Sequence, residues 1–190
     1  MAEISPIWTA RSTLNTGNVR AMLQFSMLPG NWWSFTFANK ESMTPHFKEL
    51  LNTFNENEVR YLIVGAYAVM KYSDPRFTKD LDIWVDATLD NASKVYDSLK
   101  SFGAPLDGLT VTDFASSGFY QMGRPPVRID VLMNIDGVDF DSAWKNRENA
   151  DFDGIPANFI GLPDLLTNKR ATARPQDMVD LQNLEKKSAS

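Results

Sequence analysis

The stretch from residue 60 to residue 86 constrains the fold more than any other part of this 190-residue sequence. It begins with a short apolar run of β-forming residues, Tyr61 to Val64, which ends at Gly65. The apolar residues after the glycine favour a helix, and a second β-type run, Asp-Leu-Asp-Ile-Trp-Val, begins at Asp80. The sequence therefore predicts a strand, a tight glycine turn, a short helix and another strand, an order typical of α/β folds.

The junction between the first strand and the helix is suited to a phosphate. Gly65 allows the backbone to turn tightly and to come close to a ligand. The free N–H groups at the start of the helix, including that of Ala66, and the positive end of the helix dipole favour an anion. We therefore expect Gly65 and Ala66 to contact a phosphate group.

The second strand carries two carboxylates on one face. Strand side chains alternate with a period of two, so Asp80 and Asp82 point the same way while the residues between them enter the core. Neighbouring carboxylates repel each other, and carboxylate oxygens are ligands that a hard divalent cation such as Mg²⁺ prefers. The pair therefore predicts a cation-binding site.

A third carboxylate, Asp130, lies on a strand otherwise made of core residues. Residues 118–123 and 127–133 predict two strands that form a hairpin. In the second strand Asp130 and Arg128 face away from the core. The alternative to a catalytic role for Asp130 is an ion pair with Arg128 or Arg124.

This arrangement resembles the nucleotidyltransferase superfamily with a DNA polymerase β type palm. Its signature is an apolar strand, Gly followed by Gly or Ser, a short helix, and an (Asp/Glu)-x-(Asp/Glu) strand. Gly65, Asp80 and Asp82 match the signature, while Ala66 departs from it. The third carboxylate of the superfamily corresponds to Asp130.

The resemblance implies transfer of a nucleoside monophosphate from an NTP to a hydroxyl group, with release of pyrophosphate. It implies that Asp80, Asp82 and Asp130 bind one or two Mg²⁺ ions and act in catalysis. Arg76 and Lys79 are candidates to neutralise the leaving pyrophosphate.

The C-terminal segment, residues 164–181, predicts two helices separated at Arg174-Pro175. It is similar to the C-terminal helices of small bacterial nucleotidyltransferases of the AbiEii toxin type. This resemblance implies that Lys169 reaches the phosphates of the nucleotide; the alternative is an exposed helix lysine. Asp177 is expected to cap the last helix rather than to act in catalysis.

The sequence says less about the acceptor of the nucleotidyl group than about the type of reaction. A net charge of −5 argues against a broad electrostatic surface for nucleic acid. Resemblance to toxin-type enzymes implies an RNA acceptor such as tRNA, and an antitoxin as a protein partner. The alternatives are a small-molecule acceptor such as an antibiotic, and a catalytically silent nucleotide-binding or toxin–antitoxin interaction module. Five basic residues are expected to converge near Asp130: Arg124, Arg128, Lys169, Arg170 and Arg174.

Composition excludes several other chemistries. The absence of cysteine rules out disulfides, thiolate zinc sites and cysteine nucleophiles. The single histidine, His46, cannot form a histidine metal site by itself and is expected at the surface. The apolar runs are shorter than the roughly 20 residues of a membrane helix, and no signal sequence is recognisable. We expect a cytoplasmic protein with no membrane partner.

The expected organisation is one α/β (α+β) domain, residues 43–190, with C-terminal helices at 162–187, preceded by an extension, residues 1–42, of unknown role. Within that extension residues 33–37 alternate like a strand. The fold implied is that of the nucleotidyltransferases, with a mixed, twisted sheet of about five strands and helices mainly on one face. Further elements are predicted near residues 45–55, 90–101, 111–114, 139–147 and 157–160.

Overall fold

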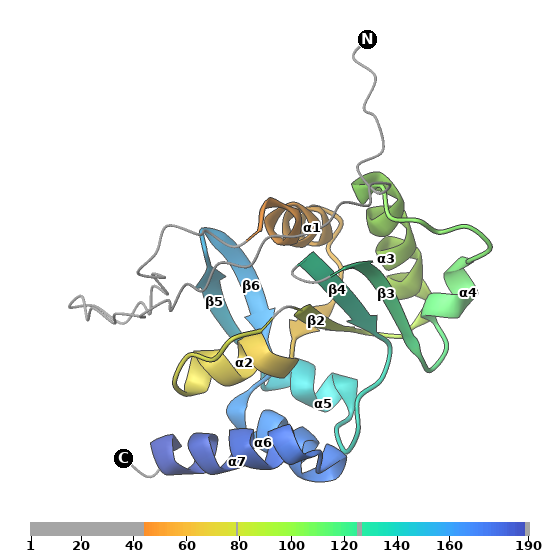
Figure 1. Ribbon diagram of the computed structural model, residues 1–190. Helices are drawn as coiled ribbons and strands as arrows, with labels where there is room; N and C mark the ends of the chain where they lie inside the picture. Colours follow the sequence, from red (N-terminus) through yellow and green to blue (C-terminus); the bar gives the residue numbers. More distant parts are fainter. Residues whose placement is uncertain (1–43, 79, 125–126, 189–190) are drawn as a thin grey trace.

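The structure is a computed structural model that describes residues 44–78, 80–124 and 127–188 (Figure 1). Its helices are α1 (Pro45–Glu56), α2 (Gly65–Tyr72), α3 (Leu89–Phe102), α4 (Val111–Phe114), α5 (Phe140–Lys145), α6 (Leu162–Thr172) and α7 (Pro175–Ser188). Its strands are β1 (Tyr61–Ile63), β2 (Asp80–Val85), β3 (Phe119–Arg124), β4 (Val127–Leu132), β5 (Glu148–Phe152) and β6 (Ile155–Phe159). The strand expected at residues 33–37 lies outside the described residues.

The strands form one mixed sheet in the order β3-β4-β2-β1-β6-β5. The central strand β2 is antiparallel to β1 and parallel to β4. The expected mixed α/β sheet is confirmed, with six strands in the described part of the chain in place of about five. The additional strand is β5, which pairs antiparallel with β6 at one edge of the sheet.

Helices α1 and α3 pack against each other and cover one face of the sheet (Figure 1). Because side chains alternate along a strand, Leu81, Ile83 and Val85 all point toward this face, and all three are fully buried. The helices bury their own apolar stripes here. In α1 the stripe is Phe47, Leu50, Leu51 and Phe54. This packing holds β2 in place and leaves the opposite face of the sheet for polar side chains.

Helices α2, α5, α6 and α7 lie together on the other side of the molecule (Figure 1). On this side the ring of Trp84, which follows Asp82 by two residues, packs edge to face on Phe140 of α5 with 4.9 Å between centroids. Helix α7 contacts both α2 and α6. Helices α6 and α7 provide the wall that lies opposite the polar side chains of β2 and β4. In the part of the chain that the structure describes, no helix has the length and apolar character needed to span a membrane.

Candidate active site

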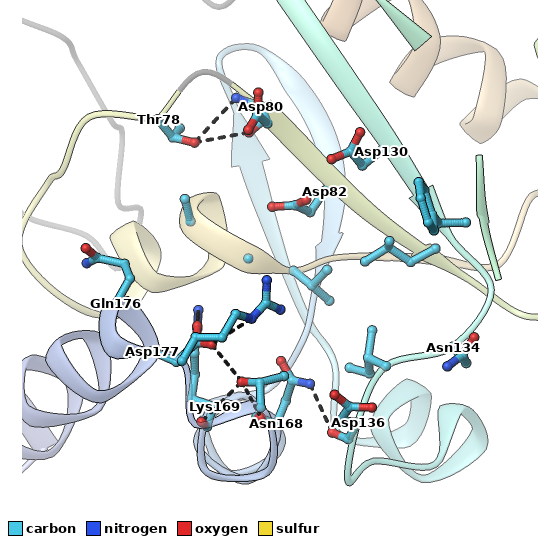
Figure 2. Close-up of a pocket in the computed structure, with 18 of the residues that line it drawn as sticks. Thr78, Asp80, Asp82, Asp130, Asn134, Asp136, Asn168, Lys169, Gln176 and Asp177 are labelled. Atoms are coloured by element: carbon cyan, nitrogen blue, oxygen red, sulfur yellow. Dashed lines mark hydrogen bonds and ion pairs between the residues drawn. The ribbon is translucent and has the colours of Figure 1, made fainter. Parts of the chain in front are cut away.

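Three carboxylates lie on two neighbouring parallel strands. Strand register pairs Asp82 of β2 with Asp130 of β4, and Asp80 of β2 with Arg128 of β4. Asp80 and Asp82 share a face of β2 because of the two-residue period. Figure 2 shows Asp82 and Asp130 close together, with Asp80 at the start of β2. The β2–β4 pairing therefore brings together carboxylates that are about 50 residues apart in sequence.

Arg128 and Gln121 hold two of these carboxylates in place. The guanidinium of Arg128 pairs with Asp80 Oδ2 through Nη2, and the same nitrogen lies 3.2 Å from Asp130 Oδ2. From the neighbouring strand β3, Gln121 Nε2 donates a hydrogen bond of 2.8 Å to Asp130 Oδ1. The ion pair predicted as an alternative for Asp130 is therefore present, although it does not remove Asp130 from the pocket described below.

Asp82 lies in an unfavourable environment for a charged carboxylate. Burial, followed by the negative charges of Asp130 and Asp80, raises the pKa of Asp82 to about 6. The positive charges of Lys169 and Arg128 offset part of this effect. An additional cation near Asp82 would stabilise its ionised form.

Gly65 begins α2 directly against Asp82. Its φ angle is +61°, in the left-handed region that favours glycine. A Cβ atom at this position would lie 2.0 Å from Asp82 Oδ2. The glycine is thus required by the close approach of the backbone to a carboxylate, in addition to the expected approach of a phosphate.

Lys169 of α6 faces the carboxylates from the opposite wall and is almost fully buried (Figure 2). Its Nζ lies 2.6 Å from Asp177 Oδ1 and 3.0 Å from Asp180 Oδ2, both on α7. Asp180, which is completely buried, also pairs with Arg76, with 3.2 Å from Nε to Oδ1. One carboxylate therefore holds two of the basic residues that were predicted to contact phosphate.

The carboxylate face of β2 and β4 and the facing side of α6 and α7 form a pocket. Its volume is about 510 Å³, within the usual range for small-molecule sites. The predicted site residues that line it are Gly65, Ala66, Arg76, Asp80, Asp82, Asp130 and Lys169. Lys79 lies outside the described residues. Of the five basic residues expected to converge near Asp130, Arg128, Lys169 and Arg174 line the pocket, whereas Arg124 and Arg170 do not.

Two sequence expectations about side chains need correction. The alternative reading of Lys169 as an exposed helix lysine is wrong, because Asp177 and Asp180 bury and pair it. Asp177 is the third residue of α7, and its carboxylate accepts hydrogen bonds from Lys169 and from the Thr172 hydroxyl instead of capping the helix. Sequence reasoning missed Gln121 and Asp180. Their only signal was position: Gln121 on the partner strand of the hairpin, and Asp180 three residues after Asp177.

The carboxylates suit a divalent cation chemically. Asp80 Oδ1 is buried and has no hydrogen-bond partner in the structure, and Asp82 lies among like charges. Carboxylate oxygens are the ligands that Mg²⁺ prefers. Within residues 44–78, 80–124 and 127–188, no three acidic or histidine side chains already form a group that could hold a metal ion. Arg128, paired with Asp80 and Asp130, supplies positive charge at this position.

Distant structural similarities connect this chain to known proteins. No family profile matches the sequence, and no curated protein matches it. Among solved structures, the chain is similar to the lincosamide antibiotic adenylyltransferase LnuA bound to lincomycin, with 14% identity and a TM-score of 0.46 over 76% of this chain and 97% of that one. It is also similar to a protein from Thermotoga maritima thought to be a nucleotidyltransferase, with 14% identity and a TM-score of 0.46 over 77% of this chain and 95% of that one. At TM-scores below 0.5 these similarities carry no weight for the activity, which has to be inferred from the site itself.

Proposed function

We propose that the protein is a magnesium-dependent nucleotidyltransferase that moves a nucleoside monophosphate from an NTP to a hydroxyl acceptor. One observation carries the proposal: the pocket places a three-carboxylate face opposite a wall with the buried Lys169, and the glycine-initiated helix α2 also lines it. A triphosphate needs both a cation-binding face and positive charge for its leaving group.

Asp80, Asp82 and Asp130 would hold Mg²⁺. When bound there, the ion would supply charge neutralisation and alignment of the triphosphate. The unpartnered Oδ1 of Asp80 and the raised pKa of Asp82 support this assignment.

The other side chains of the pocket would bind and orient the substrate. The N–H groups at the start of α2, at Gly65 and Ala66, would donate to phosphate oxygens. Lys169 and Arg76 would neutralise the leaving pyrophosphate, since Asp180 holds both at the pocket wall. Asp130, oriented by Gln121, would accept the proton of the attacking hydroxyl.

For the acceptor, we propose a hydroxyl group of RNA, such as tRNA. Arg174 supports this choice. Its Nε lies 3.2 Å from Asp177 Oδ2, but its side chain is 76% exposed and lines the pocket, so it can present positive charge to an incoming phosphate backbone. Arg170 contributes less, since it pairs with Glu185 and does not line the pocket.

The proposal can be tested by incubating the protein with each α-labelled NTP, Mg²⁺, purified tRNA and a cell extract. We expect the label to appear in RNA, and to disappear without Mg²⁺. The control is Asp82→Asn, which removes one proposed ligand and also relieves like-charge repulsion. This variant should unfold at a temperature no lower than the parent yet transfer no label.

Other results would contradict parts of the proposal. If the label appears in a small molecule instead of RNA, the acceptor is of the antibiotic type and the RNA proposal is wrong. Binding of NTP without any transfer would identify a silent nucleotide-binding module. Full transfer by a stably folded Asp82→Asn protein would overturn the site assignment.

A further inference from the structure

The proposed transfer gives no role to the part of the pocket lining formed by Phe119, Leu132 and Asn134, which we call the apolar wall. This wall carries an exposed aromatic ring. Phe119, the first residue of β3, lines the pocket, and 67% of its surface is exposed. Single exposed apolar side chains are common on protein surfaces, so exposure alone does not set Phe119 apart. Its position at the edge of the pocket does, because a ligand there could cover the ring.

Phe119 lies on the same face of the sheet as the carboxylates. Gln121, two residues further along β3, donates its hydrogen bond to Asp130, and the two-residue period places Phe119 on the side of Gln121. Phe119 pairs with Leu132 in the same ladder in which Gln121 pairs with Asp130. Leu132 also lines the pocket. The apolar wall is therefore next to the proposed reaction centre and continuous with it.

Asn134 adds a directional polar group to this wall. Its Oδ1 accepts a hydrogen bond of 2.9 Å from the backbone N–H of Gly118, which fixes the orientation of the amide. Asn134 lines the pocket, and among the described residues its Nδ2 has no hydrogen-bond partner. This bond joins Asn134 to the residue that precedes Phe119, so the amide and the ring belong to the same part of the pocket lining.

We propose that Phe119 stacks on the nucleobase of the NTP and that Asn134 Nδ2 donates to an acceptor atom at the edge of that base. This inference rests on the nucleotidyl transfer proposed above and assigns the base subsite to the wall beyond Asp130. The pocket volume of about 510 Å³ leaves room for a nucleoside beside the triphosphate. Because every base has a π-face, the ring gives affinity, while the Asn134 donor gives preference among bases.

The test separates the base from the phosphates. Dissociation constants are measured by calorimetry, with Mg²⁺ present, for ATP, GTP, CTP, UTP and inorganic tripolyphosphate. The proteins are the parent, Phe119→Ala, Phe119→Trp, and Leu89→Ala as the control. Leu89 is an apolar residue of α3 with 62% exposure that does not line the pocket. Loss of a stacked base should weaken nucleotide binding about five- to hundredfold.

We expect Phe119→Ala to weaken the binding of all four NTPs by this factor and to leave the affinity for tripolyphosphate unchanged. Phe119→Trp and Leu89→Ala should bind all five ligands as the parent does. Asn134→Asp keeps an oxygen that accepts from the Gly118 N–H but removes the Nδ2 donor. It should therefore change the order in which the four NTPs rank by affinity.

Three results would overturn the inference. The first is equal affinity of Phe119→Ala and the parent for all NTPs. The second is an equal loss for NTPs and tripolyphosphate, which would indicate a structural role for Phe119. The third is unchanged NTP binding with a raised KM for the acceptor, which would assign the ring to the acceptor. If the parent binds neither NTP nor tripolyphosphate, the proposed function itself fails, and this result is distinct from the other three.

Discussion

At the scale of single residues, Gly65 is the position where the backbone approaches a proposed metal ligand, the carboxylate of Asp82. Gly65→Ala would combine a left-handed φ of +61° with a Cβ 2.0 Å from Asp82 Oδ2. Asp82 would have to move, so we expect loss of both transfer and Mg²⁺-dependent NTP binding, together with a lower free energy of unfolding. Urea unfolding and the labelled-NTP assay measure these effects.

The control for this substitution is Gly103→Ala. Gly103 has a φ of +84°, but a Cβ there would meet no atom within 4 Å. It therefore carries only the backbone strain, about 1–2 kcal/mol for a left-handed residue other than glycine. Equal effects of the two substitutions on unfolding and on transfer would show that the contact with Asp82 does not matter.

Arg128 gives a prediction about the metal. Because its guanidinium pairs with Asp80 and Asp130, it competes with a cation for the same oxygens. Without Mg²⁺, Arg128→Gln should lower the free energy of unfolding by about 1–3 kcal/mol, since partly buried carboxylates lose their partner. With Mg²⁺, the rise in melting temperature should be larger for Arg128→Gln than for the parent.

Arg124→Gln is the matched control, because Arg124 is an exposed residue of the same hairpin and does not line the pocket. Its response to Mg²⁺ should equal that of the parent. A rise in melting temperature that is the same in Arg128→Gln and the parent would show that Mg²⁺ does not bind at these carboxylates.

Local patterns were sufficient to select four of the residues that line the pocket, but not their partners. The period of two and the glycine turn led to Gly65, Asp80, Asp82 and Asp130. The pairing of Arg128 with Asp80 depends on the parallel register of β2 and β4, which no local pattern contains. Lys169 shows the same limit. Its burial depends on α7, and the sequence of α6 alone does not distinguish a buried lysine from an exposed one.

At the scale of elements, the contact between α6 and α7 depends on a buried ion pair and is therefore sensitive to acid. Burial would raise the pKa of Asp177, but the hydrogen bonds from Lys169 and Thr172 outweigh burial, so the pKa lies below its ordinary value. The positive charge of Arg174 acts in the same direction. Asp177 therefore stabilises the fold above its unfolded-state pKa of about 4, and this contribution is lost as the pH falls through the folded-state pKa.

Asp177→Asn removes this contribution. We expect the difference in free energy of unfolding between the parent and Asp177→Asn to be constant from about pH 5 to pH 7 and to shrink below about pH 4. Urea unfolding at several pH values measures it. A difference that stays constant down to about pH 3, or that grows as the pH falls, would contradict the role assigned to the Lys169–Asp177 pair.

Elements with a strong apolar period were predictable, whereas the edge of the sheet was not. The hairpin of β3 and β4 follows from alternation and turn residues. Strand β5 has the sequence Glu-Asn-Ala-Asp-Phe, in which Phe152 alone is buried. An edge strand with one paired side needs little apolar surface, so its pairing with β6 decides its conformation.

At the scale of the whole molecule, the pocket joins segments that are distant in sequence. The carboxylates come from β2 and β4 in the middle of the sheet. The wall with Lys169 comes from α6 and α7 near the C-terminus, and Arg76 comes from the segment between α2 and β2. Figure 2 shows that Lys169 and Asp177 lie across the pocket from Asp82 and Asp130. The order of elements predicted a sheet with central acidic strands, but the closing of the pocket by the last two helices required the three-dimensional arrangement.

The last prediction concerns the domain boundary, which we propose to lie at Met43. Every residue in the hydrophobic core of the described part lies from Phe47 to Leu184, and the first of the proposed site residues is Gly65. Tolerance of truncation depends on what the removed residues bury, and this core is continuous from α1 to α7. A protein of residues 43–190 should therefore unfold in one cooperative urea transition and bind NTP as tightly as the full chain. A broad, non-cooperative transition would show that residues 1–42 complete the domain, with the predicted strand at 33–37 as the first segment to restore.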